Sequence, residues 1–151
     1  MRIVLFEPEI PSNTGNIART CAVTGAGLHL IRPLGFSIED KYLKRAGLDY
    51  WHLLDVHIHD SYGNLREEYP EGRFLFLSTK GKNIYSDFRY GDNDFLVFGR
   101  ETAGLPDYIL KENSAFTLRI PMKGGRSINL SNSVALVLYE GLRQQGFPGM
   151  R

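Results

Sequence analysis

The sequence predicts an α/β domain whose mostly parallel β-sheet carries helices on both faces. Short apolar or β-branched runs of strand length alternate along the chain with stretches of helical character, and this alternation is typical of parallel sheets with crossover helices. Several of the runs are apolar at nearly every position, as expected for strands that are covered on both faces. With 151 residues, the chain is long enough for one domain, residues 1–151, with its own core.

The expected elements follow one another without a repeat, a low-complexity tract or a linker. The expected strands are residues 3–6, 28–31, 53–58, 74–77, 95–98 and 116–120, and the expected helices are residues 14–24, 39–46, 61–69, 107–112 and about 131–145. Asn13 or Thr14 is expected to cap the first helix, and Ser131 or Asn132 the last. Such side chains accept hydrogen bonds from the free amides of a first helical turn.

Charge and cysteine content narrow the class of protein. The chain has 18 Lys and Arg against 17 Asp and Glu, a net charge of +1, so composition does not indicate a strongly basic nucleic-acid-binding protein. The single cysteine, Cys21, excludes an intramolecular disulfide and is expected in the core rather than as a nucleophile. Residues 3–6 are too short for a signal peptide, and no segment has the length of a membrane span. We therefore expect a soluble, cytoplasmic protein that does not contact membranes.

Three polar, glycine-containing motifs are the most informative part of the sequence. They read PSNTGNIAR at 11–19, FGRETAGLP at 98–106 and IPMKGGRSINLSN at 120–132. Each follows or closes a predicted strand, so all three are expected to meet at the carboxyl edge of one sheet. Open α/β domains bind their ligands at that edge. The three motifs therefore predict an active site there.

The first motif opens a helix. Asn13, Asn16 and Arg19 recur every third residue and share one helix face, while Ile17 and Cys21 lie on the opposite, apolar face. The motif predicts a polar stripe that points toward the cleft and a helix end whose amides attract anions. A capped helix with a solvated arginine is the alternative.

The second motif predicts a tight turn close to a ligand or to another loop, because Gly99 follows a strand directly and Gly104 precedes Leu105 and Pro106. Glu101 is expected to accept hydrogen bonds from free backbone amides and to fix the shape of the turn. A role as an acid or base is the alternative. The motif matches neither a dinucleotide-binding GxGxxG nor a phosphate-binding GxxxxGK pattern.

The third motif offers many backbone amides and few charged side chains, which suits an uncharged ring such as a nucleobase better than a metal or a triphosphate. Elsewhere, His57 and His59 share one face of a predicted strand, but no third ligand has a recognisable spacing. We therefore expect a surface strand there and no metal site.

The predicted last helix is apolar nearly all the way round between residues 134 and 139. A surface helix of a monomer needs only one apolar face, so a second burying surface is expected. We predict a homodimer that packs through this helix, about 131–145, together with the first helix. Cover by a loop of the same chain is the alternative.

In this order, the three motifs resemble those of the SPOUT superfamily of RNA methyltransferases. More narrowly, the chain is similar to the small single-domain tRNA 2'-O-ribose methyltransferases of the TrmL (YibK) type. The similarity runs from IVLFEPEIPSNTGNIAR through RAGLDYW and FGRETAGLP to NLSNSVALVLYEGLRQQGFPG. It implies a deep C-terminal trefoil knot, a homodimer and S-adenosylmethionine as the cofactor.

The resemblance also implies roles for individual residues. The implied cofactor-binding residues are Leu77, Gly99, Glu101, Gly104, Ile120, Met122, Ser127 and Leu130. Arg19 matches the catalytic arginine, and Asn13, Asn16, Ser131 and Tyr139 match positions near the transferred methyl group or the RNA. Lys41, Lys44, Arg45 and Arg126 are the candidate phosphate contacts, with a solvated surface as the alternative.

The implied activity is S-adenosylmethionine-dependent methylation of a ribose 2'-hydroxyl in tRNA, at the wobble nucleotide of the anticodon loop. A guanidinium stays protonated and offers no acceptor, so we expect Arg19 to grip a phosphate and to stabilise charge on the 2'-oxygen. The alternatives are methylation of another RNA such as rRNA, a non-catalytic knotted module that binds RNA or nucleotides, and a flavodoxin-like enzyme acting on small molecules.

Overall fold

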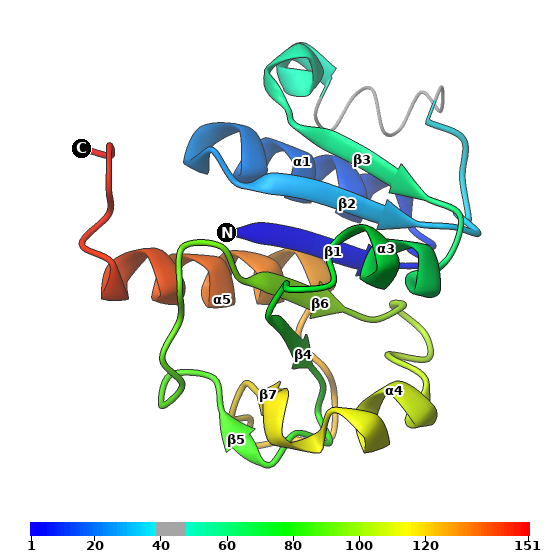
Figure 1. Cartoon of the computed structure of the whole chain (residues 1–151), viewed down its shortest axis with the longest axis vertical. Helices are drawn as coiled ribbons and strands as arrows, with labels where there is room; N and C mark the ends of the chain where they lie inside the picture. Colours follow the sequence, from blue (N-terminus) through cyan, green and yellow to red (C-terminus); the bar gives the residue numbers. More distant parts are fainter. Residues whose placement is uncertain (39–47) are drawn as a thin grey trace.

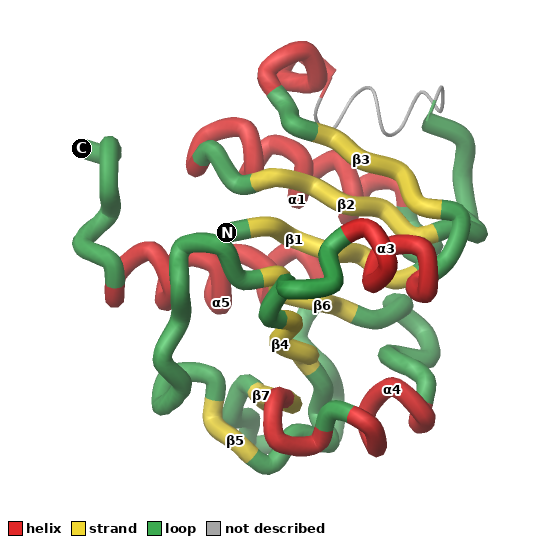
Figure 2. The backbone as a smooth tube through the Cα atoms, viewed as in Figure 1, coloured by secondary structure: helices red, strands yellow, loops and turns green. Residues whose placement is uncertain are grey.

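The computed structural model describes residues 1–38 and 48–151. In this part of the chain one seven-stranded sheet has the order β3-β2-β1-β6-β4-β7-β5, and every strand pair in it is parallel. The strands are β1 (Arg2–Phe6), β2 (Gly27–Ile31), β3 (Val56–His59), β4 (Phe74–Leu77), β5 (Asn83–Ile84), β6 (Phe95–Phe98) and β7 (Thr117–Arg119). The α-helices are α1 (Pro11–Thr24), α3 (Tyr62–Glu68), α4 (Asp107–Glu112) and α5 (Leu130–Gln144), and the 3-10 helices are η1 (Leu48–Leu53) and η2 (Ser114–Phe116). Figures 1 and 2 show helices on both sides of the sheet, as predicted.

Each face of the sheet has its own apolar core, because successive side chains of a strand point to opposite faces. On one face, Ile3 and Leu5 of β1 belong to a cluster with Ile17 and Cys21 of α1 and with the buried side of α5. On the other face, Val4 and Phe6 belong to a cluster with Leu65 of α3 and Ile109 of α4. Cys21 is fully buried, and burial raises the pKa of its thiol to about 12. This confirms that Cys21 is a core residue.

The predicted boundaries are wrong in several places. Residues 53–55 are not part of a strand, since Leu53 ends η1 and β3 begins at Val56. Phe116 closes η2 rather than opening β7, and the two-residue strand β5 was not predicted because its half-buried residues form no apolar run. The predicted helix 39–46 lies outside the described residues.

The predicted helix caps are also wrong. The N-cap of α1 is Ile10, whose side chain cannot cap, and Asn13 and Thr14 lie inside the first turn. Pro11 occupies the first helical position, where its missing N–H costs no hydrogen bond. The cap of α5 is Asn129, whose Oδ1 accepts hydrogen bonds from the amides of Ser131 and Asn132.

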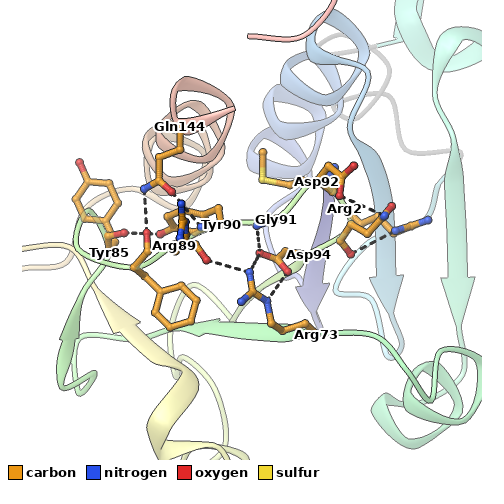
Figure 3. Close-up of polar contacts among 12 residues, drawn as sticks. Arg2, Arg73, Tyr85, Arg89, Tyr90, Gly91, Asp92, Asp94 and Gln144 are labelled. Carbon is orange, nitrogen blue, oxygen red and sulfur yellow. Dashed lines mark hydrogen bonds and ion pairs between the residues drawn. The ribbon is translucent and has the colours of Figure 1, made fainter. Parts of the chain in front are cut away.

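The amino edge of the sheet is closed by a polar network that Figure 3 shows in detail. Asp94 is 3% exposed, and Arg73 donates to both of its carboxylate oxygens, from Nε at 2.7 Å and from Nη2 at 2.6 Å. Gln144, at the end of α5, donates to the carbonyl of Phe88 and accepts from the amide of Tyr90. These contacts tie the last helix to the segment that leads into β6. This network lies at the amino edge, so the loops at the carboxyl edge do not take part in it.

Three histidines stack over β2 and β3. The ring centroids of His29 and His57 lie 4.7 Å apart, and those of His29 and His59 lie 5.1 Å apart. His29 Nδ1 shares a hydrogen bond of 2.9 Å with His59 Nε2. Both of these rings are buried, so the prediction of a surface strand is wrong at His59. Burial, followed by the nearby His57, His59 and Arg2, lowers the pKa of His29 from 6.5 to about 3.

None of the helices in the described residues has the length and apolar character to span a bilayer. The same residues contain no group of three or more His, Cys, Asp or Glu side chains arranged to hold a metal ion.

The depressed pKa of His29 predicts a loss of stability in mild acid. Between pH 6.5 and 5 the unfolded chain protonates His29 and the native protein does not, so the free energy of unfolding falls as the pH falls, by up to about 1.4 kcal/mol per pH unit for one proton. Urea unfolding at several pH values measures this slope. A His29→Phe variant should give a flatter slope over the same range whatever its overall stability, and equal slopes would contradict the prediction.

Candidate functional site

The loops that follow β4, β6 and β7 and the first turn of α1 enclose a cavity of about 430 Å³ at the carboxyl edge of the sheet. All eight residues predicted to bind the cofactor line it: Leu77, Gly99, Glu101, Gly104, Ile120, Met122, Ser127 and Leu130. Asn13, from the first motif, lines it as well. Parts of the chain more than 100 residues apart therefore meet in one hollow, as the three motifs predicted.

The turn after β6 depends on the missing side chain of Gly99. The amide of Gly104 donates to the carbonyl of Arg100 at 2.9 Å, and Gly104 has a φ of +66°. This turn brings the chain back onto Gly99, where a Cβ would lie 2.2 Å from the carbonyl carbon of Gly104. No real Cβ contact is that short, so only glycine fits this position without a shift of the backbone.

Two glutamates clamp the loop after β1 to the loop after β6. Glu101 accepts hydrogen bonds from the amides of Glu9 at 2.9 Å and of Ile10 at 3.1 Å. In return, Glu9 accepts from the amide of Thr102 at 3.1 Å and from its hydroxyl at 2.8 Å. The Thr102 hydrogen bonds hold the pKa of Glu9 below its usual value. The structural role predicted for Glu101 is thus confirmed, and its partners are the amides that precede α1.

Asn13 joins the two helices that border the cavity. It is 6% exposed, and its Oδ1 accepts a hydrogen bond of 3.1 Å from Nδ2 of Asn129. Asn129 uses its own Oδ1 to cap α5. The amide group of Asn129 therefore couples the start of α5 to the first turn of α1.

The other predicted catalytic residues do not line the cavity. Asn16 and Arg19 are exposed on later turns of α1. Of the predicted polar stripe, only Asn13 lines the cavity. Ser131 is half-buried and donates from its hydroxyl to Asn129 Oδ1 at 2.6 Å. Tyr139 is 42% exposed on α5.

Of the predicted phosphate contacts, Arg126 is exposed in the loop between β7 and α5. Lys41, Lys44 and Arg45 lie outside the described residues.

Sequence reasoning missed the contribution of the loop after β4. Ser78, Thr79 and Lys80 line the cavity next to Leu77, and Lys80 Nζ pairs with Asp107 of α4 at 2.9 Å. The signal was present, because small polar residues and a glycine follow β4 at 78–81, and small polar residues and glycines also occur in the first and second motifs. Glu9 was missed too, since nothing local indicates a partner 93 residues away.

Comparison with known proteins identifies relatives along nearly the whole chain. The profile of the SpoU rRNA Methylase family matches residues 1–139. A Yersinia pestis protein named tRNA (cytidine(34)-2'-O)-methyltransferase is 53% identical over 156 residues, which cover 99% of this chain and 96% of the relative. The crystal structure of a putative RNA methyltransferase from Bacillus anthracis superposes with a TM-score of 0.92 and 52% identity, over 99% of this chain and 96% of that one.

A more distant structure contains a ligand. The SpoU methyltransferase AviRb from Streptomyces viridochromogenes, in complex with the cofactor AdoMet, superposes with a TM-score of 0.87 and 25% identity. The match covers 96% of this chain and 60% of AviRb.

Gly99→Ala should damage the cavity. The new Cβ meets backbone at 2.2 Å, so the turn that lines the cavity must shift. A displaced cavity wall binds the cofactor less well, and we expect affinity for S-adenosylmethionine to fall roughly tenfold or more. Isothermal titration calorimetry measures the change. Gly124→Ala is the matched control, because a Cβ at that position would have no atom within 4 Å and the affinity should be kept. Equal affinities of both variants would contradict the close approach.

Proposed function

We propose that this chain, which belongs to the SpoU rRNA Methylase family, methylates the ribose 2'-hydroxyl of the wobble nucleotide in the anticodon loop of tRNA, with S-adenosylmethionine as the methyl donor. The observation that carries the proposal is the 53% identity, over 99% of this chain, to a tRNA (cytidine(34)-2'-O)-methyltransferase. An anticodon loop offers unstacked bases, which proteins read more easily than the edges of A-form duplex. With tRNA as the substrate, we propose a cytoplasmic location.

The cavity suits the cofactor. Its volume of about 430 Å³ lies in the usual range for small-molecule pockets. Leu77, Ile120 and Leu130 give it apolar walls, while Gly99 lets the backbone of a loop approach closely. This combination fits an adenine ring held between apolar side chains and backbone groups. AviRb, with the same fold, was crystallised with AdoMet.

When bound, S-adenosylmethionine supplies a methyl group on a positively charged sulfonium. The task of the protein is then to hold the ribose hydroxyl in line with that group, and such positioning is worth several kcal/mol. Asn13 stands at the cavity wall with its orientation fixed by Asn129. The clamp between Glu9 and Glu101 keeps the first turn of α1 against the loop after β6.

Arg19 acts outside the cavity. It follows Asn13 by six residues, which corresponds to about 9 Å along a helix. Its guanidinium cannot accept a proton, but its fork of donors matches a phosphate. Arg19 grips an RNA phosphate beside the target ribose and stabilises negative charge on the 2'-oxygen. A phosphate oxygen or a nearby side chain accepts the proton.

The knot and the dimer are part of the proposal. After β7, near one end of the sheet, the chain returns to α5, which packs beside α1 next to the central strands. This return past the loops that follow β4 and β6 supports a C-terminal trefoil knot. Leu136 and Tyr139 of α5 are each 42% exposed, and Val23 of α1 is 58% exposed. These apolar side chains support a homodimer through α1 and α5.

The dimer also accounts for the divided catalytic set. Asn13 lines the cavity, whereas Asn16, Arg19 and Tyr139 lie on the exposed sides of α1 and α5. We propose that two paired chains bring these side chains to each other's RNA-binding surface and so complete the site.

The activity is tested by incubating the protein with labelled S-adenosylmethionine and either total tRNA or rRNA, and mapping the labelled ribose. We expect the label on the 2'-oxygen of the wobble nucleotide. Label on rRNA alone would overturn the tRNA assignment, and calorimetric binding of S-adenosylmethionine without any transfer would indicate the non-catalytic module.

Arg19→Lys keeps the positive charge but loses the paired N–H donors of the guanidinium, so we expect transfer to slow by about 10- to 100-fold with cofactor affinity unchanged. Full activity of this variant would contradict the phosphate grip.

The dimer is tested by light scattering in dilute solution. We expect twice the mass of one chain. Leu136→Glu adds a charge to the proposed interface and should give a monomer, while Glu67→Gln, an exposed change on α3, should leave the dimer intact. A monomeric parent protein would remove the dimer from the proposal.

A further inference from the structure

A second hollow lies beside the cofactor cavity and has a different character. It measures about 360 Å³ and lies between the loop after β4, helix α4 and the start of β7. Lys80, Lys82 and Lys111 line it, with Asp107 as the one acidic residue. Three positive charges against one negative charge make it a positively charged hollow, to which we refer as the lysine hollow.

The lysine hollow is held in shape by the surrounding backbone. Gly81, between the two lysines of the loop, packs so closely on β7 that a Cβ would lie 2.5 Å from the carbonyl carbon of Leu118. The amide of Gly81 donates to the carbonyl of Ser78, and the side chain of Asn83 donates to the carbonyls of Ala115 and Thr117. The loop that carries Lys80 and Lys82 is therefore fixed to the sheet on both sides.

The charges in the lysine hollow are only partly balanced. Asp107 pairs with Lys80 at 2.9 Å, and this contact lowers the pKa of the Asp107 carboxyl. Among residues 1–38 and 48–151, Lys82 and Lys111 take part in no hydrogen bond or ion pair of their side chains. Like charges on a fixed loop and a neighbouring helix repel each other, so an anion between them is favoured.

The lysine hollow adjoins the cofactor cavity, because Lys80 and Leu110 line both. An anion bound by Lys82 and Lys111 would thus lie next to the cofactor cavity. RNA is the polyanion that the proposed function brings to this edge of the sheet.

We propose that the lysine hollow binds a backbone phosphate of the RNA substrate and so fixes the register of the target nucleotide over the cofactor cavity. The inference rests on the proposed function. The chemistry is that of lysine ammonium groups acting as point charges on phosphodiester oxygens. The carboxylate of the cofactor is the other anion that the proposed function brings near the lysine hollow, and the experiment distinguishes the two.

The test compares the parent protein with its Lys82→Gln/Lys111→Gln variant. We measure the Kd for tRNA at several KCl concentrations and the Kd for S-adenosylmethionine without RNA. If both lysines contact phosphates, the slope of log Kd against log salt falls by about 1.4 to 1.8, tRNA affinity falls at low salt, and cofactor affinity is unchanged. Weaker cofactor binding with an unchanged salt slope would overturn the proposal in favour of the cofactor carboxylate.

Arg89→Gln is the matched control. Arg89 is an exposed cation on the segment that precedes β6, at the opposite edge of the sheet (Figure 3). Its removal should leave the salt slope unchanged. If Arg89→Gln lowers the slope as much as the single Lys82→Gln or Lys111→Gln variants do, the proposal is overturned, because an exposed cation anywhere would then have the same effect. Both lysines are exposed, so thermal melting should be unchanged. If the parent protein does not bind tRNA, the proposed function itself is overturned. If the parent protein binds tRNA with a steep salt slope and the double variant has the same slope, only the proposed role of the lysine hollow is overturned.

Discussion

The reciprocal clamp between Glu9 and Glu101 is the contact on which the site depends. Strands β1 and β6 are neighbours in the sheet, so the loops that leave their carboxyl ends emerge side by side. The amides of Glu9, Ile10 and Thr102 donate to side chains rather than to other strands. Each glutamate accepts hydrogen bonds from the backbone of the other loop, and hydrogen bonds to a charged group are stronger than those between neutral groups. The clamp thus fixes both walls of the cavity at once.

The rest of the cavity follows from this arrangement. With the start of α1 held against the loop after β6, Asn13 reaches Asn129, and the cap of α5 is fixed relative to α1. On the other side, the close approach of Gly104 to Gly99 turns the second motif back toward the sheet. The three motifs are therefore parts of one hydrogen-bonded unit, which explains why small and amide-bearing residues recur in them.

Sequence alone was sufficient for six of the seven strands in the described residues and for the place of the cavity, because most of the buried parallel strands are apolar at nearly every position. The predictions from sequence were wrong where a residue distant in the chain makes the contact that a local residue was expected to make. Asn13 and Thr14 are good capping residues, but Glu101 satisfies the amides of Glu9 and Ile10 just before the helix. Pro11 can then open α1 without a side-chain cap. His59 was misplaced for a similar reason, since its burial depends on His29 and on α3 rather than on its own strand.

The nearly neutral composition of the chain is compatible with RNA as a substrate, because several acidic residues have partners within the protein. Asp94 is buried against Arg73, Glu9 and Glu101 bind backbone amides, and Glu7 lies 3.5 Å from Arg100. These carboxylates have partners within the fold, so their charge is partly neutralised there. The exposed cations at the carboxyl edge, with Lys82 and Lys111 as examples, set the local field that a polyanion meets. Net charge averages over both groups and for this reason does not report how strongly one edge of the sheet attracts RNA.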